Sequence, residues 1–224
     1  MHLAWKSLLN EKLAQCPKES GAKRVLDIGT GNGCWAIEYG MCPTNCRLEV
    51  ADIEEDWPWQ GSFDFIFVRN MGGAIKNWAR LLSKAYNALE SGGWLEFQEH
   101  SYSFEDNSKS QGSGAIEEWC ELLHRSMSDH GRPMSVGSKM VEMMSNAGIS
   151  VIKNVVWRVA ARPCPPTASA RQRHKKGRRC LSLEDLSLGP FTRYHGLDAN
   201  EVRLMCMTVR KQLRSEDNDG SWLL

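Results

Sequence analysis

The chain has 224 residues, of which 42% are hydrophobic and 25% charged, and its 28 Lys and Arg against 27 Asp and Glu leave a net charge of +1. This length and composition predict a globular protein with one main domain and a sizeable core. The small net charge excludes a general electrostatic attraction to nucleic acid or membrane, and no apolar run approaches the ~20 residues that cross a bilayer.

The cysteines and the N-terminus predict a cytoplasmic or nuclear protein with reduced thiols. The eight cysteines are scattered, and the N-terminus lacks the basic-then-apolar order of a signal peptide. Cys42 and Cys46 form the one close pair. Without a second pair or a nearby histidine, they do not predict a zinc site.

The chain begins with a predicted amphipathic helix over residues 2–15, which would cap the domain and which Pro17 ends. An apolar run follows, with one acid, Asp27, inside it. This run leads into alternating glycines separated by two polar residues: Gly29, Thr30, Gly31, Asn32 and Gly33. The order predicts a buried parallel strand, a tight glycine turn and a helix that ends near Gly40.

The spacing of these glycines separates two classes of ligand. Dinucleotide sites use G-x-G-x-x-G and P-loops close with Lys and Ser or Thr, whereas this chain has G-x-G-x-G with an acid two residues before the first glycine. Such an acid suits a ligand that carries cations and no phosphate. S-adenosylmethionine, with its ammonium and sulfonium, meets that description. The alternative is an ordinary strand–glycine–helix joint that binds nothing.

Residues 47–51 are predicted to form a second parallel strand, which ends at Asp52, 19 residues after Gly33. The right-handed crossover rule would place this strand beside the first, with both carboxyl ends at one edge. An acid at this distance commonly holds ribose hydroxyls. The alternative is a solvated acid within the acidic run 52–56.

Three further elements complete the predicted sheet. Residues 63–69 form a strongly apolar strand, residues 77–90 have helical spacing, and residues 94–98 form another strand. Gly92 and Gly93 are expected to cap the helix. The alternation of strand and helix predicts an α/β fold with a doubly wound, mostly parallel sheet.

The predicted domain covers residues 1–160. Its last elements are helices over residues 113–130 and 138–147 and a strand over residues 151–159.

Residues 161–224 are predicted to form a poorly patterned basic and polar tail with one helix, over residues 199–213. Within the tail, residues 171–179 contain six basic residues in nine. A nuclear signal or a nucleic-acid contact is one interpretation. A solvated loop is the favoured one, so nucleic acid is not an expected partner.

As an ordered set, several stretches resemble the class I S-adenosylmethionine-dependent methyltransferases, and in particular the fungal LaeA-like group associated with secondary metabolism. The stretches that carry the resemblance are residues 25–33, 35–38, 63–70, 78–82, 92–99 and 131–134.

Two features depart from that family. Its members have two strands between the glycine turn and the strand that resembles residues 63–69, and this chain has room for one. The closing antiparallel strand also lacks a counterpart, because the chain ends in a polar segment and a short apolar tail. The resemblance therefore implies a Rossmann-like fold without one inner strand and without the closing strand.

The resemblance implies transfer of a methyl group from S-adenosylmethionine to a small-molecule or protein acceptor. The residues implied for cofactor binding are Asp27, Gly29, Thr30, Gly31, Asn32, Gly33, Asp52 and Asn70. Glu99 and His100, which follow the strand over residues 94–98, are candidate general bases. The alternative is that Glu99 orients the cofactor or a loop and that His100 is merely exposed. The alternative function is a catalytically impaired, methyltransferase-like scaffold that binds a regulatory protein.

Overall fold

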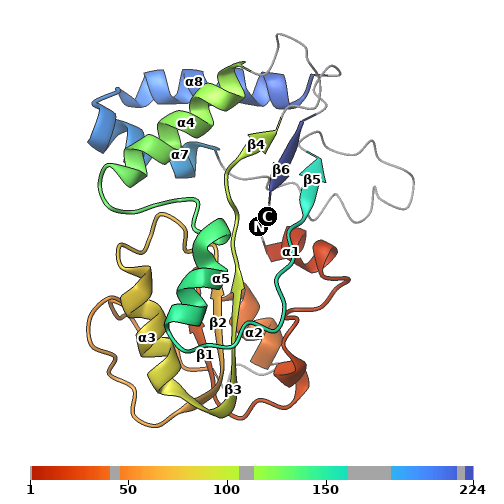
Figure 1. Cartoon of the computed structure of the whole chain (residues 1–224). Coiled ribbons are helices and arrows are strands. Elements are labelled where there is room, and N and C mark those ends of the chain that lie inside the picture. The colour runs from red at the N-terminus through yellow and green to blue at the C-terminus, as the bar shows by residue number, and fades with distance from the viewer. Residues whose placement is uncertain (1, 41–45, 106–113, 161–182, 216–219, 224) are drawn as a thin grey trace. The chain divides into compact units, whose positions relative to one another are not determined.

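The computed structural model divides the chain into two compact units (Figure 1). One unit comprises Met1–Glu99 and Ser138–Asn154, and the other comprises His100–Gly137 and Val155–Leu224. The residues whose structure is described are 2–40, 46–105, 114–160, 183–215 and 220–223.

A three-stranded parallel sheet forms the centre of the first unit. Its strands, in spatial order, are β1 Val25–Ile28, β2 Phe63–Arg69 and β3 Leu89–Gln98. The middle strand β2 is buried over its first six residues. The register pairs Asp27 with Phe67 and Phe67 with Glu96, so the carboxyl ends of all three strands lie at one edge.

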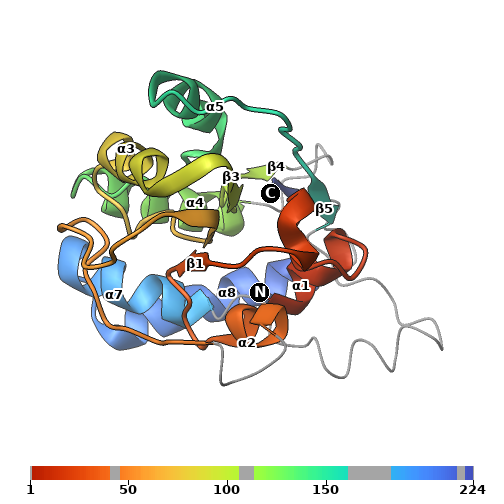
Figure 2. The same ribbon diagram turned by 90° about the horizontal axis from the view of Figure 1, so that it is seen from below.

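Helices cover both faces of this sheet, with α1 and α2 on one face and α3 and α5 on the other (Figure 2). Their bounds are α1 His2–Leu8, α2 Cys34–Gly40, α3 Trp78–Ala88 and α5 Gly137–Asn146, with a 3-10 helix η1 at Pro17–Ser20. On the first face, Phe67 stacks on Trp35 with ring centroids 3.8 Å apart. On the other face, Trp78 meets Phe97 at 5.9 Å. The predicted doubly wound α/β fold is confirmed.

The predicted strand over residues 47–51 is wrong. Residues 46–51 have no regular structure, and Leu48 is 67% exposed while Val50 is fully exposed. A strand is stable when its backbone pairs with a neighbour and one of its faces is buried. Among the described residues this segment has neither, so the sheet lacks its inner strand and β1 lies at an edge.

Two predicted helix ends are also wrong. α1 ends at Leu8, because Asn10 and Glu11 have φ of 54° and 67°, in the left-handed region that interrupts a right-handed helix. The expected glycine cap of α3 does not form. That helix ends at Ala88, and Gly92, with φ of 74°, lies inside β3, where the pairing with β2 shifts in register.

The second unit combines helices with a small antiparallel sheet. Its elements are β4 Phe104–Glu105, α4 Gly114–Ser128, β5 Arg158–Ala160, α7 Leu183–His195, α8 Ala199–Leu213 and β6 Ser221–Leu223. Trp119 of α4, Phe191 of α7 and Val202 of α8 share its core. The Trp119 indole donates a hydrogen bond to Ser187 Oγ at 2.7 Å and so ties α4 to α7.

The predicted helices over residues 113–130, 138–147 and 199–213 correspond to α4, α5 and α8. α7 was not predicted, because Pro190 lies inside it and the flanking sequence is weakly patterned. The late strand is confined to β5, since residues 151–157 have no regular structure.

The apolar tail of the chain has more structure than the sequence predicted. It forms β6, the middle strand of the antiparallel sheet in the order β4-β6-β5. Among the described residues, the parallel sheet itself has no antiparallel strand.

Candidate cofactor site

The glycine turn follows β1 directly and has the left-handed conformation that glycine adopts readily. Gly29, Gly31 and Gly33 have φ of 74°, 57° and 76°. The turn closes where Gly33 N–H donates to the carbonyl of Thr30 at 3.0 Å. Asn32 Oδ1 accepts from Cys34 N–H at 3.2 Å, at the start of α2. A side chain at any of the three glycines would be strained.

The space around the turn differs from glycine to glycine. A methyl group at Gly31 would meet no heavy atom nearer than the Gly29 carbonyl oxygen at 3.9 Å, and one at Gly33 would meet Ile37 Cδ1 at 3.7 Å. A methyl group at Gly29 would lie 2.2 Å from Met71 Sδ. The exposed Gly31 therefore has room around it, the buried Gly33 has Ile37 at ordinary contact distance, and Gly29 packs tightly under a methionine.

Asp27 is the acid of this turn. Its carboxylate accepts a hydrogen bond from Thr30 Oγ1 at 2.7 Å. Burial raises the pKa of Asp27 above its ordinary value, and the Thr30 hydrogen bond and the charge of Arg69 partly oppose that rise. The structure thus brings Asp27 and Thr30 together at the mouth of β1, and their predicted role in cofactor binding stays a prediction.

Arg69, at the end of β2, belongs to the same edge and was not among the predicted residues. Its Nε donates to Gln98 Oε1 at 2.8 Å and one terminal nitrogen donates to the Leu13 carbonyl at 3.3 Å. Burial lowers the pKa of Arg69 to about 10, with Asp27 and other acids opposing the decrease. Arg69 therefore stays charged at neutral pH. The sequence feature that could have indicated Arg69 is its position at the end of a mostly apolar strand.

The N-terminal helix reaches the same edge. The buried Trp5 of α1 donates from Nε1 to Asn70 Oδ1 at 3.3 Å. Lys6 pairs with Glu38 of α2 at 2.7 Å. Asn70 itself has φ of 53°, and its N–H donates to the Gln98 carbonyl at 3.0 Å. The predicted site residue Asn70 is thus held between α1 and β3.

Both carboxylate oxygens of Glu99 accept backbone hydrogen bonds. One accepts from Met71 N–H at 2.9 Å and the other from Gly72 N–H at 3.0 Å. Burial raises the pKa of Glu99 to about 7, although these two hydrogen bonds oppose the rise.

His100 begins the second unit and is also engaged. Its Nδ1 accepts from Tyr102 N–H at 2.8 Å, and its ring lies against those of Tyr102 and Trp222. Burial lowers the pKa of His100 to about 4, so the ring is neutral at pH 7. Because Nδ1 accepts, the proton of the neutral ring is on Nε2.

Asp52 lies in a turn and not at the end of a strand. Its side chain is exposed and accepts from Glu54 N–H at 2.9 Å. The turn is tied to α3, because Lys84 Nζ donates to the carbonyl of Glu54 at 2.9 Å, and the Glu54 carboxylate accepts from Asn77 N–H at 2.9 Å. The strand that was to place Asp52 beside β1 is absent from the described segment, so its role toward a ribose stays a prediction.

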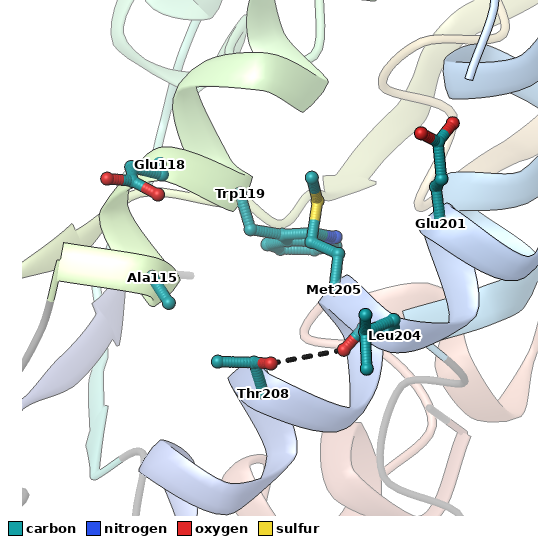
Figure 3. Close-up of a pocket in the computed structure, with 7 residues that line it drawn as sticks. All are labelled: Ala115, Glu118, Trp119, Glu201, Leu204, Met205 and Thr208. Carbon is teal, nitrogen blue, oxygen red and sulfur yellow. Dashed lines mark hydrogen bonds between the residues drawn. The ribbon is translucent and has the colours of Figure 1, made fainter. Parts of the chain in front are cut away.

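A separate hollow of about 340 Å³ lies between α4 and α8 of the second unit (Figure 3). Its lining residues are Ala115, Glu118, Trp119, Glu201, Leu204, Met205 and Thr208. Thr208 Oγ1 donates to the Leu204 carbonyl within α8 at 3.1 Å. None of the predicted site residues lines this hollow.

The predictions for the Cys42 and Cys46 pair and for the basic run 171–179 concern residues that the structure describes only in part. Cys42 and the basic run 171–179 lie outside the described residues. Within the described part of the chain, no group of three or more His, Cys, Asp and Glu side chains is arranged to hold a metal ion. The same residues include no helix long and apolar enough to cross a membrane.

Comparison with known proteins gives one family match. The family model described as "Methyltransferase domain" matches residues 1–154. Methyltransferase pytC of Aspergillus terreus is 26% identical over 247 residues, which cover 97% of this chain and 74% of pytC. Since that alignment is longer than the 224 residues of the chain, pytC has residues with no counterpart here.

A second relative is a regulator. The secondary metabolism regulator laeA of Aspergillus niger is 25% identical over 232 residues, covering 91% of this chain and 60% of laeA. The chain therefore spans less than two thirds of laeA. Among solved structures, Haemonchus contortus Phospholethanolamine N-methyltransferase 2, in complex with phosphomonomethylethanolamine and S-adenosylhomocysteine, has a TM-score of 0.48 at 17% identity. The aligned residues cover 92% of this chain and 49% of the Haemonchus contortus enzyme.

Proposed function

The chain belongs to the methyltransferase-domain family, and on that premise we propose that it binds S-adenosylmethionine at the glycine turn after β1 and transfers the methyl group to an acceptor. The observation that carries the proposal is the turn itself. Three left-handed glycines follow a strand that contains a partly buried acid, and the middle one, Gly31, is exposed with room for a ligand to approach its backbone.

The residues at the end of β1 fit the methionine end of this cofactor. The Asp27 carboxylate is the counter-ion that an ammonium group requires, and the exposed backbone at Gly31 is open to close approach. Thr30 holds Asp27 in place, and Asn32 fixes the end of the turn. Asn70 borders the same edge. For the ribose end Asp52 is the candidate, although no described strand supports it.

The bound cofactor would supply a methyl group already activated on a sulfonium. The remaining task of the protein is to align the acceptor and to exclude water. Trp5 and Asn70 join α1 to the strand edge and would help to close the site. Glu99 and His100 stay the predicted candidates for a general base. Each already accepts hydrogen bonds from backbone N–H groups, which weighs against that role.

The acceptor we propose is a small molecule or a protein side chain of fungal secondary metabolism, in the cytoplasm or nucleus. The link to fungal secondary metabolism is supported by the similarity to methyltransferase pytC and to the secondary metabolism regulator laeA, both from Aspergillus species. Substrate pockets in one fold serve many chemistries, so the cofactor motif does not select between the two acceptor classes.

Calorimetric titration of the purified chain with S-adenosylhomocysteine tests cofactor binding. Asp27→Asn and Gly31→Ala are each expected to weaken binding at least tenfold, since one removes the counter-ion and the other strains and fills the turn. The matched controls are Asp129→Asn, an exposed acid of the second unit, and Gly131→Ala, a glycine with φ of 69° in open space. No heat from the parent protein at millimolar ligand would refute the proposal.

A second candidate function is a methyltransferase-like scaffold that binds a regulatory protein and has lost turnover. It is favoured by the absence of a strand in residues 46–51 and by the exposure of Leu48 and Val50. Retained binding of S-adenosylhomocysteine together with no methyl transfer to any acceptor in a fungal extract would support this function. Methyl transfer dependent on Asp27 would exclude it.

A further inference from the structure

The side chain of Met71 occupies the notch that Gly29 leaves open. A methyl group at Gly29 would lie 2.2 Å from Met71 Sδ, 3.1 Å from Cε and 3.3 Å from Cγ. The thioether therefore rests directly on the first glycine of the turn. Whatever fixes Met71 also fixes one wall of the turn.

The backbone at Met71 is fixed by a small set of hydrogen bonds. Asn70, in the left-handed region, donates to the Gln98 carbonyl, and Ala74 N–H donates to the Met71 carbonyl at 2.9 Å. The Glu99 carboxylate accepts the next two N–H groups, those of Met71 and Gly72, one on each oxygen. Glu99 thus links the end of β3 to the loop that carries the methionine.

The electrostatic surroundings of Glu99 are simple. Burial raises the pKa of Glu99, and only the hydrogen bonds from Met71 N–H and Gly72 N–H oppose the rise. The other charged groups at this edge of the sheet do not contribute to the shift. Asp27 and Arg69 influence each other, and His100, the next residue, is neutral at pH 7. Near neutral pH Glu99 therefore changes its charge while His100 stays neutral.

We propose that Glu99 is a positioning residue of the cofactor site, which in its ionised form clamps the N–H groups of Met71 and Gly72 and holds the Met71 thioether on Gly29. A protonated carboxyl has one oxygen fewer to accept a backbone hydrogen bond, so one N–H is released and Met71 loosens. A more mobile Met71 side chain must be ordered when the ligand binds. Because this ordering costs free energy, the affinity for the ligand falls. The effect on affinity rests on the proposed function, whereas the clamp does not.

Labelling the methionine methyl groups with carbon-13 tests the clamp by NMR without any ligand. The Met71 signal, identified by its loss in Met71→Leu, is expected to shift with pH with a midpoint near 7. In Glu99→Gln, whose amide offers one acceptor oxygen, the signal should stay near the acid position of the parent at every pH. The buried Met140 of α5 is the internal control and should not titrate.

The result that overturns the inference is a Met71 signal that is constant between pH 6 and 8 in the parent, or that titrates equally in Glu99→Gln. The parent titration needs only Met71→Leu, to assign the signal, so the test holds even if Glu99→Gln folds poorly. Calorimetry adds the functional arm. The parent should bind S-adenosylhomocysteine about fivefold more weakly at pH 6 than at pH 8, roughly the effect of one lost hydrogen bond, while Glu99→Gln shows no such pH dependence.

The two arms separate failure of the clamp from failure of the proposed function. A titrating Met71 signal with no ligand binding at any pH refutes cofactor binding and leaves the clamp standing. Ligand binding with a constant Met71 signal refutes the clamp and leaves cofactor binding standing.

Discussion

Arg69 ends β2 and Asp27 is the last residue but one of the adjacent strand β1, and the charge of each opposes the effect of burial on the pKa of the other. The same guanidinium donates to Gln98 on β3 and to the Leu13 carbonyl. One cation therefore links β2 to β3 and to the N-terminal segment by hydrogen bonds, and it acts on Asp27 of β1 through its charge.

Replacing Arg69 by Met should destabilise the first unit. The substitution removes the charge that opposes the rise in the Asp27 pKa and the hydrogen bonds that Arg69 donates to Gln98 and Leu13, and we expect a loss of about 2 kcal/mol in the free energy of unfolding. Urea unfolding measures it. Arg80→Met is the control, because its pair with Asp56 at 3.5 Å is exposed and should contribute under about 0.5 kcal/mol. Equal losses in the two variants would contradict the assignment.

Replacing Gly29 by Ala should be more damaging than the same change at a glycine in open space. Both Gly29 and Gly131 have positive φ, but only at Gly29 would the new methyl meet the Met71 side chain. We expect about 1 kcal/mol for Gly131→Ala from backbone strain and about 1.5 kcal/mol for Gly29→Ala, where the flexible end of the Met71 side chain must also move. Adding Met71→Ala to Gly29→Ala should recover part of the difference, and no recovery would contradict the contact.

The strand–turn–helix core of the fold could be predicted because its determinants are local. The apolar run of β1, the glycines and the helical spacing of α3, α4 and α8 are each contained within a few turns of chain, and the structure has these elements where they were expected. The turn that holds Asp27 and Thr30 is local as well, since three residues separate the two partners.

What could not be predicted depends on contacts between distant residues. Residues 47–51 alternate like a strand, but pairing requires a neighbour that the pattern does not reveal. Glu99 and Met71 are 28 residues apart, and Arg69 and Leu13 are 56 apart. The first contact arises because β2 and β3 end at one edge of the sheet, and the second because the segment after α1 reaches the end of β2.

Glu99 and His100 are expected to change stability with pH in opposite directions. Burial raises the pKa of Glu99 from 4.5 to about 7, so its contribution is complete below pH 4.5 and is lost as the pH rises through 7. Burial lowers the pKa of His100 from 6.5 to about 4, so its contribution is complete above pH 6.5 and is lost as the pH falls through 4. Between pH 4.5 and 6.5 the two slopes oppose each other.

Urea unfolding across that pH range should separate the two groups. Relative to the parent, Glu99→Gln should gain stability as the pH rises. In the parent, Glu99 lowers the free energy of unfolding by about 1.4 kcal/mol per pH unit in this range, and the variant lacks that loss. His100→Asn, which keeps an acceptor for Tyr102 N–H, should change in the reverse sense. Two variants whose pH profiles run parallel to the parent would contradict both assignments.

Replacing Leu48 and Val50 together by Ser should leave stability almost unchanged. Both side chains are largely exposed and the segment pairs with no strand among the described residues, so we expect a change within about 0.5 kcal/mol in urea unfolding. Ile28→Ser on β1, at 2% exposure, is the matched apolar-to-polar control and should cost about 3 kcal/mol. A loss in the double variant close to that of the control would mean that residues 47–51 pair with β1 in solution. The chain would then have the strand that places Asp52 at the ligand edge, and the scaffold alternative would lose its main support.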